Sequence, residues 1–412
     1  MGYGGKSGTN YDENDDANYG TYYGANFGAI QRWSLRFLLI LTLGLSCWAA
    51  EARAQDRASF DAVDLNASVA LDKLIAELAT KRVVFVGEIH DRYDHHLNQL
   101  EIIKRLHALD PDMAIGVEYF QQPFQQQVDD YIAGKISENE FLRDTEYFSR
   151  WGYDYRFYAP IFRYAREQHI PVRALNVPTA LTSTIAKVGI AGLSGKERAY
   201  LPKEIEPADD DYKSRLRDAF EGHPGMKPGA FDHFVEAQLT WDEGMAESAA
   251  AYLNANPGRR MVILAGEGHL EYGVGIPKRL ERRTKATYAI VLSSGDEVEP
   301  HMADYLLLSK PQELPPAGSL GANLKEIRSE CVVSSLISGG AGEKAGLRNG
   351  DILVAIDAQP VKTAADVHLA LWDKAPGDRV QVEVRHKRLL RAASMRDLEV
   401  QLAAAPEVPN AP

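Results

Sequence analysis

Short apolar runs that alternate with helical patterns constrain the fold of this chain more than any other feature. Segments 66–80 and 95–109 carry apolar residues at helical spacing. The apolar runs are bounded by Gly, Pro or charged residues and cover residues 83–87, 113–118, 171–178, 261–266 and 287–292. Runs that are apolar on both faces suit buried parallel strands. Strands that alternate with helices predict an α/β fold, with a doubly wound, mostly parallel sheet flanked by helices.

The rest of the chain divides around this predicted sheet. We expect the α/β domain to cover residues 60–305, with a helical insertion at about 180–256, where strand signals are missing. A Pro-rich linker is expected at 306–316. Short strands, Gly-rich turns and one helix then predict a small β-rich domain over 317–395. The Ala- and Pro-rich end of the chain, 396–412, is expected to be a disordered tail.

Residues 1–54 predict export rather than folding. Residues 1–28 are rich in Gly, Tyr, Asn and Asp and hold too little aliphatic surface to offset the entropy of ordering. The apolar run Phe37–Ala50 is too short to span a membrane, which takes about 20 residues. Basic residues before this run and Ala52-Arg53-Ala54 after it indicate a signal peptide that is cleaved before Gln55. The alternative is a buried core helix.

Lipid attachment is a second route out of the cytoplasm. The sequence Gly44-Leu45-Ser46-Cys47 loosely resembles a bacterial lipobox, so Cys47 is a candidate for lipidation. Either route predicts an exported protein that is periplasmic or associated with the outer membrane. Any membrane attachment would then be by lipid only.

Composition excludes several classes of protein. The 46 Lys and Arg against 58 Asp and Glu give a net charge of −12, which repels phosphate backbones, so we expect no nucleic-acid partner. Cys47 and Cys331 are the only cysteines, and this excludes a disulfide framework. No Cys-x-x-Cys-His motif occurs, which argues against covalently attached haem.

Polar residues follow four of the predicted strands. Glu88 and His90 come after the first run, and Glu118 comes after the second. Asn176 lies at the end of the third run, and His269 follows the fourth. Open α/β sheets bind ligands outside the carboxyl ends of their strands. We therefore expect these five side chains to converge on one crevice.

Two chemistries fit this set of residues. Two histidines with one or two carboxylates match sites that bind Zn²⁺, Mn²⁺ or Fe²⁺ and keep one position open, so Glu88, His90, Glu118 and His269 are candidate metal ligands. Such a metal would activate water for hydrolysis. Without a metal, His90 and Glu118 could still act as general acid and base. In a non-catalytic interpretation, the carboxylates cap helices and the histidines bond to backbone groups.

Two further segments carry candidate binding residues. Residues 151–164 form a dense aromatic cluster, in which Tyr155 and Tyr158 would share a helix face. This cluster either packs in the core or offers haem a phenolate ligand and flat aromatic faces. Gln238 and Asp242 lie one turn apart on a later predicted helix. They are candidates for a substrate pocket, the alternative being a solvated helix.

Six motifs in the first domain together resemble the ChaN-like family of haem-binding uptake proteins. They lie in the family's order between about residues 70 and 300 and read GEIHD, GVE, RWGYDYRFYAPIF, LNVP, AQLTWDEGMA and AGEGH. The resemblance implies an exported bacterial protein that binds haem or an iron complex as a homodimer and serves iron uptake. It also implies a tyrosine as the iron ligand, for which Tyr119, Tyr155 and Tyr158 are the candidates.

A wider resemblance implies a different activity. The ChaN-like family is similar to the TIKI metalloproteases and, more remotely, to the erythromycin esterases. The TIKI pattern of two Gly-x-x-His motifs and one Glu is matched by Gly87–His90, Gly266–His269 and Glu118. This resemblance implies a metal-dependent hydrolase, either a peptidase or an esterase. The sequence thus leaves open whether the protein is an enzyme.

The second domain resembles a PDZ domain of the type found with periplasmic proteases. The motifs that carry this resemblance are SLG at 319–321, GEKAGL at 342–347, GDIL at 350–353 and PGDRV at 376–380. It implies that backbone N–H groups near Leu320 and Gly321 hold the C-terminal carboxylate of a partner peptide, which adds a strand to the sheet edge. The alternatives are a PDZ module that packs on the main domain without binding peptide, and a scaffold in which only the PDZ domain is active.

Overall fold

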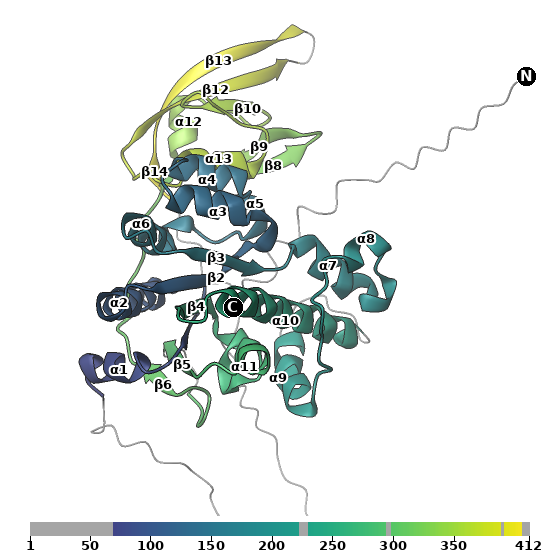
Figure 1. The fold of residues 1–412 in the computed structure, drawn as a ribbon. Helices are drawn as coiled ribbons and strands as arrows, with labels where there is room; N and C mark the ends of the chain where they lie inside the picture. Colours follow the sequence, from purple (N-terminus) through teal and green to yellow (C-terminus); the bar gives the residue numbers. More distant parts are fainter. Residues whose placement is uncertain (1–68, 222–229, 294–297, 389–390, 406–412) are drawn as a thin grey trace, which may run out of the picture.

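The computed structural model describes residues 69–221, 230–293, 298–388 and 391–405 (Figure 1). The expected disordered start, the signal peptide and Cys47 all lie within residues 1–54, outside the described residues. Among the helices of the described part, none has the length and apolar character needed to cross a membrane.

Six strands form the central sheet of the first domain. They are β1 (Val83–Glu88), β2 (Met113–Gln121), β3 (Val172–Asn176), β4 (Arg260–Gly266), β5 (Tyr288–Ser293) and β6 (Tyr305–Leu307). Their order is β3-β2-β4-β1-β5-β6, and neighbouring strands run parallel throughout. The predicted α/β fold is therefore confirmed. The linker was expected from residue 306, but β6 reaches Leu307, because a three-residue edge strand is too short to show a periodic pattern.

Helices cover both faces of this sheet (Figure 1). They are α1 (Leu71–Leu78), α2 (Tyr93–Leu109), α3 (Gln125–Ile132), α4 (Glu138–Asp144), α5 (Tyr147–Arg150), α6 (Ala159–Glu167), α7 (Thr179–Val188), α8 (Gly195–Arg198), α9 (Asp210–Glu221), α10 (Phe231–Ala255) and α11 (Ile276–Thr284). Short 3-10 helices are η2 (Gln122–Phe124), η3 (Tyr155–Phe157), η4 (Ile190–Gly192), η5 (Glu267–His269) and η6 (Glu271–Gly273).

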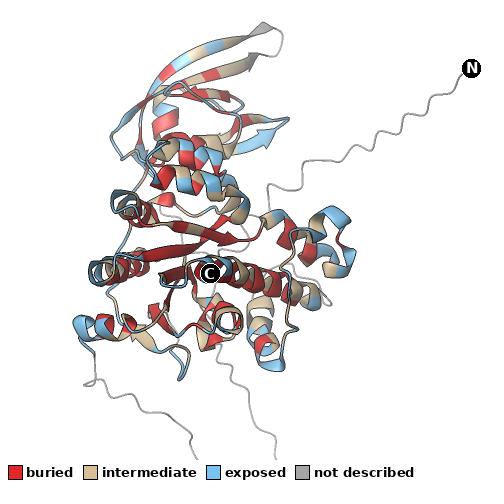
Figure 2. Ribbon diagram, in the orientation of Figure 1, coloured by how far each residue is buried: buried red, intermediate tan, exposed pale blue. Residues whose placement is uncertain are grey.

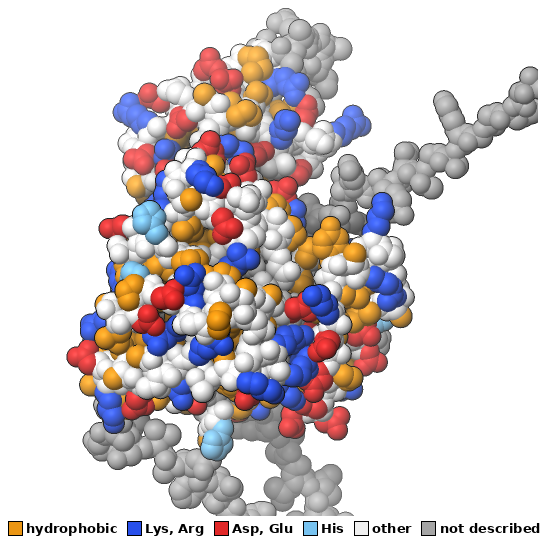
Figure 3. All heavy atoms as spheres, viewed as in Figure 1, with side chains coloured by type: hydrophobic (Ala, Val, Ile, Leu, Met, Phe, Trp, Pro, Cys, Tyr) orange, Lys and Arg blue, Asp and Glu red, His pale blue; other side chains and the backbone are white. Residues whose placement is uncertain are grey.

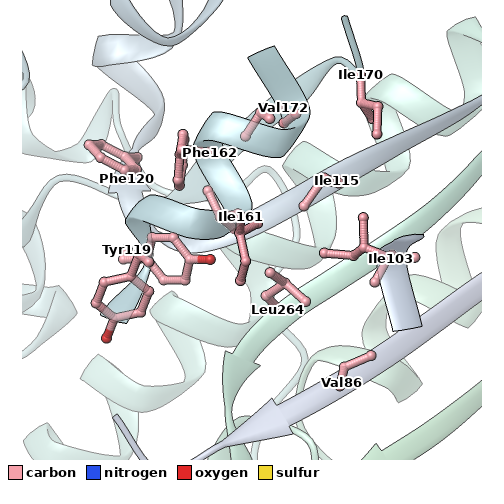
Figure 4. Packing of buried hydrophobic residues seen from close by; sticks show 14 of the residues in the cluster. Val86, Ile103, Ile115, Tyr119, Phe120, Ile161, Phe162, Ile170, Val172 and Leu264 are labelled. Carbon is pink, nitrogen blue, oxygen red and sulfur yellow. The ribbon is translucent and has the colours of Figure 1, made fainter. Parts of the chain in front are cut away.

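The strands are apolar along their whole length because each face packs on a separate hydrophobic cluster. Successive strand residues point to opposite faces of a sheet. Val84 and Val86 join the cluster that contains α2 and α6, whereas Val83 and Phe85 join the cluster that contains α10 and α11. Figure 2 shows the strands as buried, and Figure 4 shows part of the first cluster around Ile161.

The segment between β3 and β4 contains helices α7 to α10 and no strand among its described residues. Helix α10 has 25 residues and lies against the sheet (Figure 1). Ala246, Ala249 and Ala250 line its buried side, and their small side chains let the helix approach the strands closely. This approach places Asp242, further toward the start of the helix, near the carboxyl ends of the strands.

The second domain is built on an antiparallel sheet. Its elements are β7 (Gly318–Ser319), β8 (Ala322–Ile327), β9 (Glu330–Leu336), α12 (Ala341–Ala345), β10 (Ile352–Ile356), β11 (Gln359–Pro360), α13 (Ala364–Leu371), β12 (Arg379–Arg388), β13 (Arg391–Gln401) and β14 (Ala403–Ala404). The main sheet has the order β13-β12-β10-β9-β8, and β14 pairs with β7. Strand β8 therefore lies at an edge of the sheet.

The prediction of a disordered tail over 396–412 is wrong for its first part. Strand β13 continues to Gln401 and pairs with β12, and β14 follows it. Leu398, Val400 and Leu402 are buried in the core of the second domain, and the residues between them face solvent. The domain is longer than predicted because these alternating apolar residues complete its core. The Ala- and Pro-rich residues that follow made this alternation hard to recognise in the sequence.

The two domains are in contact through α13. Leu369 and Trp372, at the end of this helix, belong to the hydrophobic cluster of the first domain, whereas Val367, Ala370 and Leu371 belong to the core of the second. Figure 1 shows α13 lying against α4. One helix thus contributes to two cores.

Charged side chains of both signs are interspersed over the surface in Figure 3. Some of them form ion pairs, such as Arg259 Nε with Asp112 Oδ1 at 2.7 Å and Arg105 NH1 with Asp72 Oδ1 at 2.9 Å. Exposed pairs of this kind contribute at most about 1 kcal/mol each. Burial of the strands and helices in the clusters described above is therefore the main source of stability.

Candidate functional site at the carboxyl ends of the strands

Four of the five strand-end residues form the centre of the candidate site. Glu88 is the last residue of β1, Glu118 lies in β2, and His269 lies in η5 directly after β4. His90 follows β1 by two residues. Because these strands are parallel neighbours, their carboxyl ends bring the four side chains together, as the sequence predicts.

Asn176 stands apart from these four. It is the last residue of β3, the edge strand beyond β2, and is aligned with Gln121. Its side chain is buried and its Oδ1 has no hydrogen-bond partner among the described residues. No hydrogen bond joins the Asn176 side chain to the four central side chains in the described part of the chain.

His90 and Glu88 form a buried pair. The Nδ1 atom of His90 lies 2.6 Å from Oε1 of Glu88, and Glu88 is 1% exposed. Burial alone would lower the pKa of His90, but the Glu88 carboxylate, with a smaller contribution from Glu118, raises it to about 9. The other carboxylate oxygen of Glu88 lies 3.6 Å from Nε2 of His96. Glu88 therefore orients His90 and favours its charged form, whereas Nε2 of His96 is bonded to the backbone oxygen of His90 at 3.1 Å.

His269 belongs to a second and longer chain of polar contacts. Its Nδ1 lies 2.6 Å from Oδ1 of Asp242, and the Tyr212 hydroxyl donates to Oδ2 of Asp242 at 2.6 Å. Its Nε2 lies 3.4 Å from Oε1 of Glu118. Burial alone would lower the pKa of His269, but Glu118 and Asp242 raise it to about 10. Tyr212 comes from α9, so the helical insertion supplies part of the site.

Glu118 lies between the two imidazoles. Its Oε2 accepts a hydrogen bond of 2.7 Å from the Gly266 backbone N–H. Burial alone would raise the pKa of Glu118, but His269, His90 and the Gly266 N–H lower it to about 2. The site therefore holds a carboxylate between two imidazoles, and in the absence of a metal these contacts favour the charged form of all three groups.

A close approach explains the glycine at the end of β4. A Cβ atom on Gly266 would lie 2.9 Å from Cε1 and 3.2 Å from Nε2 of His90, and 3.7 Å from Oε2 of Glu118. The backbone here has φ −56° and ψ 142°, which any residue can adopt. The space between His90 and β4, rather than the backbone conformation, therefore favours glycine.

Aromatic rings cover the outer side of the His90 pair. The Trp151 and Tyr153 rings lie with centroids 5.0 Å and 4.8 Å from the His90 ring. Trp241 lies 6.3 Å from the ring of His269. The sequence prediction placed its aromatic candidates later in segment 151–164 and missed Trp151 and Tyr153. The Gly between Trp151 and Tyr153 indicates a loop and could have identified them. Tyr155 lies in η3, and Tyr158 directly precedes α6.

The three tyrosines expected as haem ligands are all buried. Tyr119 packs on Tyr158 with centroids 4.2 Å apart, and its hydroxyl has no partner among the described residues. The Tyr158 hydroxyl accepts from Trp151 Nε1 at 3.0 Å. The Tyr155 hydroxyl donates to Oε1 of Glu138, at 3.2 Å. Burial raises the pKa of all three phenols well above the usual range.

Tyr153 differs from these three because it is half-buried and its hydroxyl makes no hydrogen bond to the described residues. Burial and the carboxylates of Glu88, Asp91 and Glu118 raise its pKa. Among the tyrosines of this region that the structure describes, Tyr153 is therefore the one best placed to reach a ligand beside His90.

The two residues expected on the later helix have different positions. Asp242 lies beside His269 and orients its imidazole, and its role in a substrate pocket stays a prediction. Gln238 is half-buried on α10, one turn earlier, and its side chain makes no hydrogen bond to the described residues. A further carboxyl, Glu267, was not predicted: burial, Glu271 and Glu88 raise its pKa to about 8, so it carries a proton at neutral pH.

The four expected metal ligands are not arranged as one coordination sphere. Within the part of the chain that the structure describes, no group of three or more His, Cys, Asp or Glu side chains is placed to hold a metal ion. Glu88 is hydrogen-bonded to Nδ1 of His90, so it would orient this imidazole rather than coordinate the metal itself. The remaining donors, His90 Nε2, His269 Nε2 and Glu118, retain the chemistry that such a metal needs.

The loop expected to bind a peptide carboxylate precedes the edge strand β8. Leu320 is buried, and Gly321 has φ +65°, a conformation that glycine adopts without strain. The Gly321 N–H donates to the Ser319 hydroxyl at 3.1 Å. An incoming carboxylate would have to displace this hydroxyl or share the N–H with it.

Comparison with curated proteins finds two relatives of different kinds. The chain is 26% identical over 262 residues to RETICULATA-RELATED 5, a chloroplastic protein of Arabidopsis thaliana, which covers 57% of this chain and 35% of that protein. It is also 26% identical over 185 residues to the periplasmic pH-dependent serine endoprotease DegQ of Escherichia coli K12. This match covers 44% of this chain and 37% of DegQ. The chain thus spans little more than a third of the length of these relatives.

Solved structures with a similar fold include ChaN of Campylobacter jejuni with cofacial haem binding. That likeness has a TM-score of 0.48 and 20% identity, and covers 58% of this chain and 91% of the other. An erythromycin esterase mutant in its open conformation has a TM-score of 0.36 and 14% identity, with 54% and 72% covered.

Family models match both domains. A PDZ-domain model matches residues 318–402, which include β13 and so agree with the longer second domain. The model described as haem-binding uptake, Tiki superfamily, ChaN matches residues 74–280, just over half of the chain. The protein therefore belongs to the ChaN family of haem-binding uptake proteins in the Tiki superfamily, and carries a PDZ domain after its ChaN domain.

Proposed function

We propose that this protein binds haem at the mouth of the crevice formed by the strand ends, and that it is an exported protein of iron uptake. The observation that carries the proposal is the position of Tyr153, whose half-buried ring lies 4.8 Å from His90 and whose hydroxyl has no partner among the described residues. Membership of the haem-binding uptake family supports the same ligand.

Tyr153 and Trp151, which lie beside His90, fit a haem group chemically. A tyrosine phenolate is an established ligand of haem iron, and aromatic faces suit a flat porphyrin. Tyr153 would hold the iron through its phenolic oxygen, and Trp151 would lie against the ring. Haem, when bound, supplies the iron centre and the large apolar surface that this arrangement accommodates.

His90 and Glu88 support this tyrosine electrostatically. Binding to iron requires the phenolate form of Tyr153, whereas burial and the nearby carboxylates favour the phenol. The protonated imidazole of His90 places a positive charge beside the Tyr153 ring and so opposes this effect. Glu88 keeps that charge in place through its bond to Nδ1.

The test is a haemin titration followed by absorption spectroscopy on the purified protein. We expect a saturable Soret shift with a fixed stoichiometry, and loss of that shift in Tyr153→Phe. Tyr155→Phe is the matched control, because Tyr155 is buried and its hydroxyl is bonded to Glu138. A flat titration of the wild-type protein would reject the proposal. Loss of the shift in Tyr155→Phe alone would reject Tyr153 as the ligand.

Export and partner binding belong to the same proposal. The apolar run before Ala52-Arg53-Ala54 and the lipobox-like sequence at Cys47 support transport across the inner membrane, to the periplasm or the outer membrane. The exposed edge of β8 supports docking of a C-terminal peptide by the PDZ domain. The family also supports a homodimer in the haem-bound state. Cell fractionation and analytical ultracentrifugation with and without haemin test these points.

Metal-dependent hydrolysis is a second candidate, and the two imidazoles favour it. In both His90 and His269, Nδ1 is bonded to a carboxylate, and a metal would replace the proton on Nε2, which in His269 lies 3.4 Å from Glu118. Histidines that bind metals commonly have their other ring nitrogen bonded to a carboxylate in this way. Elemental analysis should then find about one divalent metal per chain, absent from His269→Ala and retained in His107→Ala. A metal-free wild-type protein after incubation with Zn²⁺ or Mn²⁺ would reject it.

A further inference from the structure

Helix α13 of the PDZ domain holds an unusual position, because it is packed on both sides. Val367, Ala370 and Leu371 face the core of its own domain. Leu369 and Trp372 are buried in the hydrophobic cluster of the ChaN domain. The interface between the domains is therefore a buried hydrophobic contact and not a polar surface contact.

Trp372 makes specific contacts across this boundary. Its Nε1 donates a hydrogen bond of 2.7 Å to Oδ1 of Asn139, in the first turn of α4. Its ring meets the Tyr155 ring edge-on with centroids 5.1 Å apart, and the Arg163 guanidinium lies 5.5 Å from its centre. One turn earlier, His368 stacks on Phe148 of α5 at 6.0 Å.

The elements that receive α13 lead directly to the candidate site. Tyr155, which contacts Trp372, packs on Tyr147 at 5.2 Å. The Tyr147 hydroxyl donates to the backbone oxygen of Tyr153 at 3.0 Å. Helix α5 ends at Arg150 and is followed by Trp151, whose ring, like that of Tyr153, covers His90. Contacts are thus continuous from the PDZ domain to the loop over His90.

We propose that docking of the PDZ domain through α13 positions the Trp151–Tyr153 loop over His90, so that ligand binding in the ChaN domain depends on the docked PDZ domain. The proposal rests on the ligand site proposed above. Its physical basis is that α5, of four residues, packs through Phe148 on His368 and through Tyr147 on Tyr155, the ring that Trp372 contacts. Removing Trp372 takes away the support on one side of these rings.

The inference predicts that an undocked PDZ domain weakens ligand binding at a distance. When two sites of a protein are coupled, a change at one site typically alters the affinity of the other for its ligand by about 5- to 150-fold. We therefore expect Trp372→Ala to raise the Kd for haemin at least about fivefold. Asn139→Ala removes the same hydrogen bond from the ChaN side and should shift the Kd in the same direction by less.

The experiment combines haemin titration with hydrogen–deuterium exchange on the full chain. Trp372→Ala and Asn139→Ala should speed exchange in residues 147–158, while β12 and β13 stay protected, which shows that the PDZ domain remains folded. Met395→Ala is the control, because this side chain is exposed on the same domain. It should change neither exchange in 147–158 nor the Kd.

The possible results separate this inference from the proposed function. Faster exchange in 147–158 together with weaker haemin binding supports it. Faster exchange in a protein that binds no haemin in its wild-type form leaves the loop contact supported and rejects the haem proposal. Unchanged exchange and unchanged Kd in a folded Trp372→Ala variant would overturn the inference.

Discussion

Replacing Asp242 with Asn tests whether the buried histidines are held as cations. Asn has the same shape and keeps one acceptor for the Tyr212 hydroxyl, so the change removes the charge and the acceptor that faces Nδ1 of His269. Burial alone would lower the pKa of His269, whereas Glu118 and Asp242 together raise it from 6.5 to about 10. We expect Asp242→Asn to lower this pKa markedly.

The same pKa gives the size and the pH range of the effect on stability. A rise from 6.5 to about 10 corresponds to about 5 kcal/mol of stabilisation, at about 1.4 kcal/mol for each tenfold change. Glu118 and Asp242 both contribute to this rise, so we expect loss of the Asp242 charge to cost on the order of 2 kcal/mol. A group whose pKa is higher in the folded state stabilises fully below its unfolded pKa, 6.5, and this stabilisation is lost as the pH rises to about 10.

Urea denaturation of both proteins at pH 6 and at pH 10.5 measures this difference. Asp242→Asn should be less stable than the wild type by about 2 kcal/mol at pH 6, and the gap should shrink at pH 10.5, where His269 is neutral in both. An NMR titration of His269 gives the pKa directly. An equal loss of stability at both pH values would show that Asp242 acts through packing or hydrogen bonding, and the reasoning from charge would be refuted.

Three further predictions follow from packing. Gly266→Ala should displace His90 and cost about 1–3 kcal/mol, measured by urea denaturation, with haemin affinity reduced; unchanged stability would contradict the close approach. Burial, with Glu326 and Asp366, raises the pKa of Cys331 to about 11, so iodoacetamide followed by peptide mass analysis should find this thiol unmodified in the native protein. Deleting residues 396–412 should unfold the PDZ domain, as seen by NMR dispersion, whereas deleting 406–412 should not.

The sequence predicted the sheet and the centre of the site because both follow from strand patterns. Glu88 ends β1, Glu118 directly follows the last β2 residue paired with β4, and His269 follows β4, so parallel pairing brings them together. The positions of Tyr212 and Tyr153 depend instead on how a helical insertion and a loop pack against the sheet. No local pattern carries that information: Tyr153 and Tyr155 are two residues apart in one aromatic run, yet one is half-buried and the other fully buried.

The shared helix α13 has a consequence for the way this protein unfolds. Two domains that touch only through a polar surface melt in separate transitions. Here separation of the two domains would expose Leu369 and Trp372, which the cluster of the first domain buries. It would also remove the Trp372 ring from Tyr155. Heating should therefore melt both domains in one calorimetric transition, and an isolated PDZ fragment should be aggregation-prone. The connecting segment separates two families of sequence whose hydrophobic cores share one helix.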